Sequence, residues 1–302
     1  SVLMENLAAM GVVLQPRTIR FYLQQLDRDG LTHLVSRRRG RVITVSGREE
    51  LSHVNVIERV GFVASRVDHL GYRMSFNSRT RQGSIVLNMA LVDGRVSTLA
   101  IREVRRVFQA GLAMGDRVVL ARGGEELGGL KVPEGMLAIG TICSVTLNGI
   151  FLHEGIPIAS RYGGLVEIRG GRPVRFVELI EYAGTTLDPL EAFIQAGMTS
   201  VRECASTGHG VIGASFREIP SVALEQVQRL KRSMAGNGLD GILAIGLPNR
   251  PLLDIPVAPG RTGMVVIGGL NPVAGVYESG VRVKIHSLVG LEDFDSFRPW
   301  QE

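Results

Sequence analysis

The amino-acid sequence predicts an α+β fold in which a short helix-and-hairpin unit precedes a longer, internally repeated α/β region. Two observations support this division. The whole formal net charge of +5 lies in the first sixth of the chain, and a 25-residue segment at 132–156 has a counterpart 125 positions later, at 257–281. A chain of 302 residues is also long enough for two or three domains.

The charge distribution separates the two regions chemically. Residues 1–48 carry eight arginines and three acidic residues, whereas residues 49–302 carry 26 basic and 26 acidic side chains. A concentrated positive charge favours a polyanionic partner for the N-terminal region and gives the neutral remainder no such attraction.

The N-terminal region has the element order of a winged helix-turn-helix. Apolar residues at helical spacing over 3–10 predict one short helix, and Pro16 is suited to the first turn of a second. Residues 31–36 and 41–46 are typical of two short strands around an arginine-rich loop. The usual fold has three helices, and so we expect a truncated domain over residues 1–50 that lacks the first helix.

The polar side chains of this region suit DNA. Arginine and glutamine on an exposed helix can contact base edges in the major groove, and arginines at a hairpin tip can neutralise phosphates. The alternative is a small helical cap with a solvated basic face. The DNA-binding candidates are Arg17, Thr18, Arg20 and Gln24 on the second helix and Arg37, Arg38, Arg39 and Arg41 at the hairpin.

The longer region, residues 55–290, is interpreted as two βαββαβ units over 84–168 and 174–288. Each copy of the 25-residue segment has the order strand, small polar turn, helix, glycine and strand, which favours an internal duplication. Two such units predict two ferredoxin-like plaits. The pattern also predicts a strand over 59–64 and a strand-rich stretch over 201–219.

The polar turn between a buried strand and a helix is the main candidate for a small-molecule site. Backbone N–H groups at a helix start attract anions, and Ser144 and Asn271 are suitable N-cap residues. Arg217, assisted by His209, is a second way to hold a carboxylate. Ordinary capped helices and surface ion pairs explain the same residues, and both interpretations stay open. The candidate ligand-binding residues are Ser144, Thr146, Asn148, Arg161, His209, Arg217 and Asn271.

The sequence has no pattern typical of an enzyme or a metal centre. Cys143 and Cys204 lack zinc-ligand spacing, and we expect two reduced thiols in a cytoplasmic protein. A predicted helix places Cys143 and His153 about 15 Å apart, too far for a nucleophile and its base. No segment has the roughly 18 uninterrupted apolar residues of a membrane span. We therefore expect no catalytic residues, no metal, no cofactor and no membrane partner.

Several segments resemble signature segments of the NrpR nitrogen-repressor family. They are Gly-Thr-Ile-Cys-Ser-Val-Thr-Leu-Asn-Gly at 140–149, Ser-Phe-Arg-Glu-Ile-Pro at 215–220 and Gly-Gly-Leu-Asn-Pro at 268–272. The segment at 17–22 resembles the winged helix of the same family. The resemblance extends from the truncated winged helix through one regulatory domain that ends near Val289.

The resemblance implies a transcriptional repressor that binds double-stranded operator DNA as a homodimer and senses nitrogen status through 2-oxoglutarate, a small anionic metabolite. Family members can carry two regulatory domains, and this chain has room for one. The main alternative is a metabolite-binding or enzymatic α/β domain with a helical appendage that does not bind DNA. RNA binding is a weaker hypothesis, because aromatic residues make up only 5% of the chain and no strand carries a base-stacking pattern.

Overall fold

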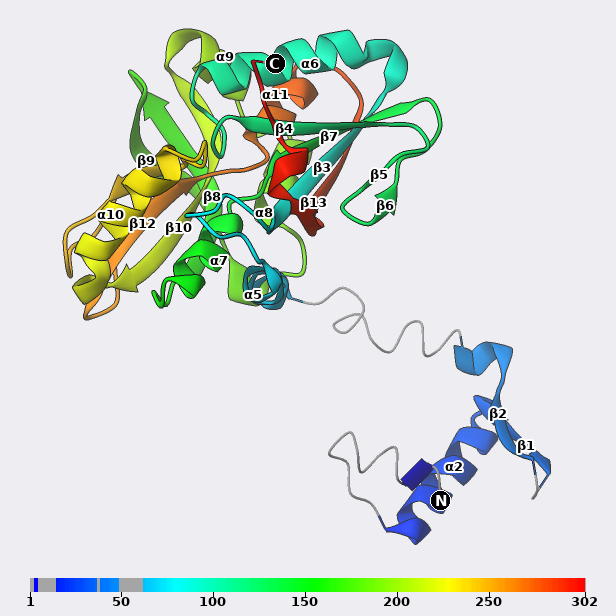
Figure 1. The fold of residues 1–302 in the computed structure, drawn as a ribbon. Coiled ribbons are helices and arrows are strands. Elements are labelled where there is room, and N and C mark those ends of the chain that lie inside the picture. Colours follow the sequence, from blue (N-terminus) through cyan, green and yellow to red (C-terminus); the bar gives the residue numbers. More distant parts are fainter. Residues whose placement is uncertain (1–2, 5–14, 37–38, 49–61, 302) are drawn as a thin grey trace. The chain divides into compact units, whose positions relative to one another are not determined.

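The computed structural model describes residues 3–4, 15–36, 39–48 and 62–301 (Figure 1). The chain divides into two compact units, residues 1–61 (unit 1) and 62–302 (unit 2), and each is described by itself.

The described part of unit 1 includes helix α2 (Pro16–Arg28) and a hairpin of β1 (Thr32–Ser36) and β2 (Gly40–Ile43), and residues 45–48 are also helical. Pro16 lies in the first turn of the helix, where its missing N–H costs no hydrogen bond. Asp27 ties the helix to the hairpin, because its carboxylate accepts bonds from Thr32 Oγ1 at 2.7 Å and Arg41 Nε at 2.8 Å. The expected second helix and hairpin are therefore present, but residues 45–46, expected in the second strand, are helical. Most of the expected helix over 3–10 lies outside the described residues.

Unit 2 contains two sets of elements, here called series, and each has the order strand, helix, strand, strand, helix, strand. The first series is β3 (Ser84–Asp93), α6 (Ser97–Gln109), β4 (Arg117–Arg122), β7 (Met136–Ile142), α7 (Thr146–His153) and β8 (Ala159–Arg169). The second series is β10 (Gly210–Pro220), α10 (Leu224–Ala235), β11 (Ile242–Ile245), β12 (Arg261–Ile267), α11 (Asn271–Glu278) and β13 (Val283–Asp293). β12 and α11 begin and end 125 positions after β7 and α7, so the repeated segment forms the same two elements in each series.

Shorter elements surround the two series. Helix α5 (Val63–Arg73) precedes the first series, and β9 (Arg172–Glu181), α8 (Pro189–Gln195) and α9 (Val201–Thr207) lie between the two. A small hairpin, a two-residue strand and four 3-10 turns are the remaining elements, namely β5 (Glu126–Leu127), β6 (Leu130–Lys131), β14 (Arg298–Pro299), η1 (Gly94–Val96), η2 (Tyr182–Gly184), η3 (Ser221–Ala223) and η4 (Phe294–Ser296).

The two series exchange their last strands. One sheet has the order β13-β3-β7-β4-β14 and the other β11-β12-β10-β8-β9, with antiparallel pairing throughout. β8 ends the first series but pairs with β10, with Gly164 opposite Ala214. β13 ends the second series but pairs with β3, with Ile285 opposite Ala90. Neither series completes a sheet alone, and the two sheets confirm the expected mixture of helices and antiparallel strands.

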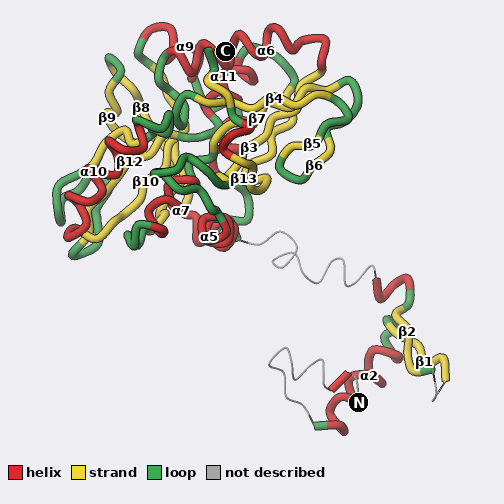
Figure 2. Tube along the Cα trace, viewed as in Figure 1, coloured by secondary structure: helices red, strands yellow, loops and turns green. Residues whose placement is uncertain are grey.

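Helices cover unit 2 on two sides. Figure 2 shows α6, α9 and α11 together on one side and α5 beside α7 on the opposite side. α6 and α11 come from different series, and they share an apolar cluster with β7 that includes Val104, Phe108, Ile139 and Val276. Burying these side chains stabilises the contact between the series. No helix in the described part of the chain is long and apolar enough to cross a membrane.

The strand-to-helix turns of the two series meet at Gly269. Thr141 Oγ1, in β7, donates a hydrogen bond of 2.8 Å to the carbonyl of Gly269. A Cβ atom on Gly269 would collide with the carbonyl oxygen of Ile142 and would lie 2.9 Å from the Cα of Cys143. The absence of a side chain is therefore what lets the two turns approach so closely.

Two segments expected as strands are helices. Half of the expected strand over 59–64 lies outside the described residues, and its end belongs to α5, in which Val63, Val67 and Leu70 are buried at helical spacing. Within the stretch expected to be strand-rich, residues 201–207 form α9, and β10 follows it. Both segments are short, and their tertiary packing decides between helix and strand.

The second series begins later than the repeat pattern suggests. Residues 172–181 form β9, which pairs with β8 at the edge of the sheet and does not start the second series. The series starts at Gly210, where β10 lies in the middle of the same sheet.

The contact between the two turns can be tested with alanine at Gly269. We expect Gly269→Ala to lower the free energy of unfolding by about 1–3 kcal/mol, as overpacking does elsewhere. Gly184→Ala is the matched control, because no atom lies within 4 Å of a Cβ built at Gly184. Urea denaturation followed by circular dichroism measures both, and equal stability of the two variants would contradict the close approach.

Candidate functional site

The most unusual side chain of unit 2 is the buried arginine Arg217, which is 1% exposed. Its Nε donates to Ser215 Oγ at 3.2 Å, its Nη2 donates to Ser144 Oγ at 2.9 Å, and its Nη1 donates to Asn148 Oδ1. Asn148 in turn donates from Nδ2 to Ser160 Oγ at 3.0 Å. These five side chains are called the Arg217 cluster.

The cluster is assembled from both series. Ser215 and Arg217 are two residues apart on β10, so both side chains lie on the same face of the sheet. β8 is paired beside β10 and brings Ser160 directly opposite Arg217. Ser144 lies in the turn after β7, and Asn148 lies in the first turn of α7. The exchange of β8 therefore places residues of the first series around an arginine of the second.

The charge of Arg217 has no anionic partner among the residues that the structure describes. Its hydrogen-bond acceptors are two hydroxyl groups and one amide oxygen, all neutral. Burial lowers the pKa of the Arg217 guanidinium, since removal from water disfavours the charged form. A guanidinium nevertheless stays protonated in proteins, and a buried charge without a counter-ion is energetically costly. The cluster is therefore electrostatically incomplete.

A small cavity adjoins the cluster at Ser144. Its volume is about 10 Å³, and its polar lining side chains include Asn88, Ser144, Tyr182 and Asp188. This space accommodates about one water molecule. A dicarboxylate or a larger metabolite does not fit into it without movement of its walls.

Asp188 and Cys143 are both perturbed by this environment. Asp188 begins α8 and accepts hydrogen bonds of 3.0 Å from the backbone N–H groups of Leu190 and Glu191. Burial raises the pKa of the Asp188 carboxyl to about 6, and the two N–H bonds only partly oppose this effect. Burial also raises the pKa of the Cys143 thiol to about 12, so Cys143 is a neutral buried thiol at physiological pH and lacks the reactivity of a thiolate.

Helix α5 forms one wall of the cavity and packs on the cluster. Val67 lines the cavity, and a Cβ on Gly71 would lie 3.4 Å from the Cβ of Asn148. Arg66 Nη2 donates bonds of 3.1 Å to the carbonyls of Ser287 and Leu288, which anchors the helix to β13. α5 is also the first described helix of unit 2, directly after residues 49–61 in the chain.

Thr146 and Asn271 hold the backbone together. Thr146 Oγ1 accepts a hydrogen bond of 3.1 Å from the backbone N–H of Val86. Asn271 accepts from the N–H of Gly213 at 2.9 Å and donates to its carbonyl at 3.0 Å. The two residues are 125 positions apart, and each binds the first strand of its own series. Neither Ser144 nor Asn271 caps its helix through its side chain, because the N-cap positions are Val145 and Leu270.

The side chains of two other candidates are exposed and are not among the hydrogen-bonded members of the cluster, although Arg161 directly follows Ser160 in the chain. Arg161 is exposed, with its guanidinium carbon 5.9 Å from the ring centre of Tyr162. His209 is exposed in the turn before β10, where its backbone N–H donates to Thr207 Oγ1 at 3.1 Å. The sequence interpretation did not include Ser160 and Ser215. Ser215 was recognisable from its two-residue spacing to Arg217, but only the strand pairing identifies Ser160.

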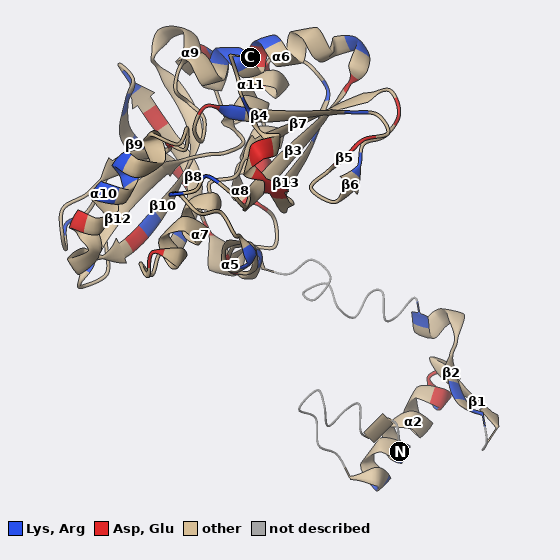
Figure 3. Ribbon diagram, viewed as in Figure 1, with Lys and Arg blue, Asp and Glu red and all other residues tan. Residues whose placement is uncertain are grey.

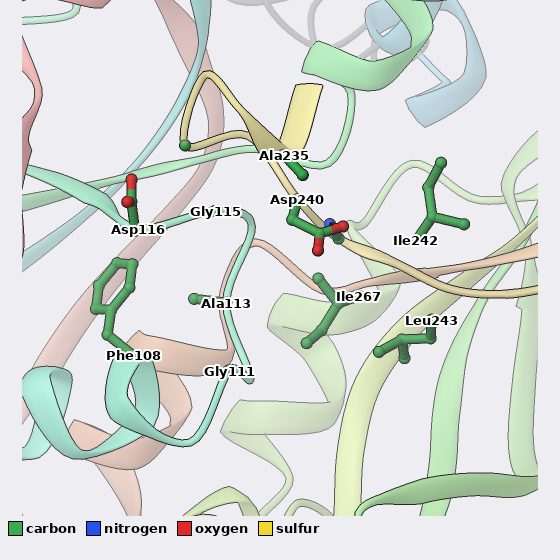
Figure 4. A pocket seen from close by; sticks show the side chains of 12 residues that line it. Phe108, Gly111, Ala113, Gly115, Asp116, Ala235, Asp240, Ile242, Leu243 and Ile267 are labelled. Carbon is green, nitrogen blue, oxygen red and sulfur yellow. Dashed lines mark hydrogen bonds between the residues drawn. The ribbon is translucent and has the colours of Figure 1, made fainter. Parts of the chain in front are cut away.

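A larger cavity lies elsewhere in unit 2, between the loops that follow α6 and α10 (Figure 4). Its volume is about 310 Å³, and its lining includes Phe108, Ile242 and Ile267. The charged residues of its lining, Asp116 and Asp240, are both acidic.

The DNA-binding candidates that the structure describes lie on α2 and the hairpin, and Figure 3 shows basic residues on both. Arg17, Arg20 and Gln24 are exposed, Thr18 is half-buried, and Arg39 is exposed beside β2. Arg41 forms an ion pair of 2.8 Å with Asp27. Arg37 and Arg38 lie outside the described residues.

Comparisons with other proteins agree with the resemblance found in the sequence. The family model for NrpR regulatory domains NRD1 and 2 matches residues 60–299. The chain is 31% identical over 294 residues to the global nitrogen regulator NrpRI of Methanosarcina mazei, which covers 97% of this chain and 90% of that protein.

Two further relatives are longer proteins. The global nitrogen regulators NrpR of Methanococcus maripaludis and Methanocaldococcus jannaschii are 31% and 30% identical over 98% of this chain, which spans 51% and 52% of their lengths. A crystal structure of a nitrogen repressor-like protein from Methanococcus jannaschii is similar at a TM-score of 0.68 and 27% identity, covering 79% of this chain and 98% of that chain. The chain therefore belongs to the NrpR family of nitrogen regulators.

Proposed function

We propose that this protein is a DNA-binding transcriptional repressor of nitrogen-regulated genes that works as a homodimer and binds a small anionic effector, 2-oxoglutarate, at Arg217. The observation that carries the effector site is the buried guanidinium of Arg217, whose described partners are all neutral. The relatives are named global nitrogen regulators, which supports a regulatory role without catalysis.

A carboxylate would complete the Arg217 cluster. The planar guanidinium can bind two carboxylate oxygens at once, and Ser144 and Asn148 can turn their polar groups toward the same ligand. The neutral acceptors that now surround Arg217 would then be replaced or supplemented by a negative charge. An anion that pairs with the buried guanidinium would offset the cost of burying that charge, and this gain would contribute to the binding free energy of the anion.

Effector binding requires the wall of the cavity to move. The cavity beside Ser144 has a volume of about 10 Å³, far too small for a dicarboxylate. Helix α5 is the wall we expect to move, because it lines the cavity with Val67 and is the first described helix after the N-terminal unit. Its displacement would alter the chain segment that leads to unit 1. Effector binding would thereby change the geometry at which two DNA-binding units meet their half-sites.

Unit 1 is proposed as a winged helix. Arg17, Arg20 and Gln24 follow one face of α2 and suit the major groove, while the basic hairpin suits the phosphate backbone. We interpret the strand orders β13-β3-β7-β4 and β8-β10-β12-β11 in unit 2 as two ferredoxin-like plaits that have exchanged one strand.

The effector site is tested with Arg217→Met and Arg217→Lys. Calorimetric titration with 2-oxoglutarate should give a heat signal for the wild type, an affinity about a hundredfold or more lower for Arg217→Met, and a smaller loss for Arg217→Lys, which keeps the charge but not the two-point contact. Arg161→Met is the matched control, because the Arg161 side chain is exposed and is not a hydrogen-bonded member of the cluster.

The same proteins give a second measurement. Millimolar 2-oxoglutarate should raise the melting temperature of the wild type and of Arg161→Met, but not that of Arg217→Met. No heat and no thermal shift with the wild type would rule out this effector, and full binding by Arg217→Met would rule out this site.

The perturbed carboxyl of Asp188 predicts a pH dependence of stability. Its folded-state pKa of about 6 lies above the ordinary value of 3.8, so the folded protein binds this proton more tightly than the unfolded chain. The wild type should therefore lose stability relative to Asp188→Asn as the pH rises from about 4 to about 6, because the asparagine does not ionise. Thermal unfolding of both proteins between pH 4 and 8 measures the difference, and a difference independent of pH would contradict the raised pKa of Asp188.

DNA binding is tested with the whole chain and the DNA upstream of its own gene. The affinity should fall steeply with salt, because each phosphate contact contributes a slope of about −0.9 in log K against log salt. Arg17→Ala with Arg20→Ala should weaken binding about tenfold or more. Arg229→Ala, on the exposed face of α10, is the control. Binding that does not depend on salt or on Arg17 and Arg20 would refute the winged-helix role.

A further inference from the structure

The edge strand β9 (Arg172–Glu181) exposes a backbone edge and side chains that another strand could bind. It is the outer strand of the sheet β11-β12-β10-β8-β9, so one of its backbone edges has no partner strand among the residues that the structure describes. Val174, Val177 and Leu179 are 40%, 37% and 40% exposed, and the charged residues of the strand are exposed as well. Figure 3 shows both charge signs on the β8–β9 hairpin.

The other sheet edges in the described part of unit 2 are less available. β13 is long, but α5 and α8 pack beside it and Arg66 binds its carbonyls. β11 has four residues and β14 has two. β11 comes close to β9, but the two strands do not pair, and seven of the ten residues of β9 are exposed. An exposed ten-residue edge strand is a template for another strand.

The sequence of β9 is complementary to itself. It reads Arg-Pro-Val-Arg-Phe-Val-Glu-Leu-Ile-Glu, with two basic residues in the first half and two acidic residues in mirrored positions of the second half. An antiparallel copy centred between Phe176 and Val177 brings Arg175 opposite Glu178. The same register brings Val174 opposite Leu179 and Phe176 opposite Val177. Opposite charges and apolar side chains are the cross-strand pairs that stabilise antiparallel sheets.

The bulges of β9 place the central charges on one face. In the register with β8, Arg175 lies opposite Glu167 and Glu178 lies opposite Leu165, while Val174 and Val177 are the extra residues. Glu167 and Leu165 are two positions apart on β8, so Arg175 and Glu178 share a face of the sheet. Arg175 already forms an ion pair of 2.7 Å with Glu167, which holds its guanidinium on that face. Two copies can therefore form both Arg175–Glu178 pairs on the same side.

We propose that β9 is the homodimer interface of the regulatory region, in which the β9 strands of two copies pair antiparallel about a two-fold axis between Phe176 and Val177. Such an interface is isologous, because each copy contributes the same residues. It joins the two five-stranded sheets into one continuous sheet. The inference deepens the homodimer of the proposed function and does not depend on the identity of the effector.

A charge-swap experiment with the full chain tests the interface. Sedimentation velocity should give a dimer for the wild type at micromolar concentration. Arg175→Glu places four acidic residues at the two central pairs, and Glu178→Arg places four basic residues there, so each variant alone should dimerise at least tenfold more weakly. The exposed charge reversal Arg229→Glu on α10 is the control and should leave the dimer unchanged.

Combining the two charge reversals distinguishes a loss of dimerisation at the interface from a folding defect of the variants. An equimolar mixture of Arg175→Glu and Glu178→Arg should form a heterodimer, because every central pair is again of opposite sign. The double variant Arg175→Glu with Glu178→Arg should recover the homodimer. Hydrogen exchange at the backbone of β9 should be slower in each dimer than in each monomeric variant.

The possible outcomes distinguish a failure of the β9 interface from a failure of the homodimer itself. A Glu178→Arg variant that dimerises like the wild type, or a mixture that stays monomeric, overturns the β9 interface and leaves a homodimer built on another surface. A wild type that is monomeric at 100 μM overturns the homodimer and the interface together, while the effector and DNA measurements remain as they are. Capture of a different protein on β9 with no self-association also overturns the proposal.

Discussion

The exchange of β8 and β13 between the two series is the constraint on which the rest of unit 2 depends. Each sheet needs a strand from the other series, and so the strand-to-helix turns must meet closely enough that Gly269 leaves no space for a side chain. The same pairing brings Ser160 of the first series opposite Arg217 of the second. The polar cluster around Arg217 is thus a product of the sheet topology, and neither series contains it alone.

The internal symmetry is broken at the cluster. The positions equivalent to Ser144 and Asn148 in the second series, 125 residues later, are Gly269 and Val273. Thr146 and Asn271 are also equivalent, and each binds the backbone of its own first strand, at Val86 and Gly213. Val86 and Gly213 are therefore equivalent positions, and they lie 127 residues apart in the chain. The same offset along β3 and β10 makes the buried Ala90 the counterpart of Arg217. A charged residue at only one of two equivalent positions indicates that its series has a specialised role. Backbone-binding residues that folding requires are present in both series.

The sequence was most informative where a local pattern determines the structure. Pro16 at the start of α2 and the repeated segment that forms β7 with α7 and β12 with α11 are examples, because turns, caps and periodicity act over a few residues. The strand exchange involves partners far apart in the chain, and no local pattern specifies it. The chemistry of Arg217 made it a candidate ligand-binding residue, but the hydrogen bond from Asn148 to Ser160 depends on tertiary packing. Arg161 and His209 have suitable chemistry in exposed positions, but they are not hydrogen-bonded members of the cluster.

The exchange of β8 and β13 also indicates how a single series would fold alone. A chain with only one series would have to take its last strand from another molecule, which is domain swapping between two identical subunits. In this protein residues 170–209 connect the two series covalently, so the exchange occurs within one chain at a high effective concentration. Such a link removes the need for identical halves. It lets one half keep an apolar interior at Ala90 while the other half carries a buried cation.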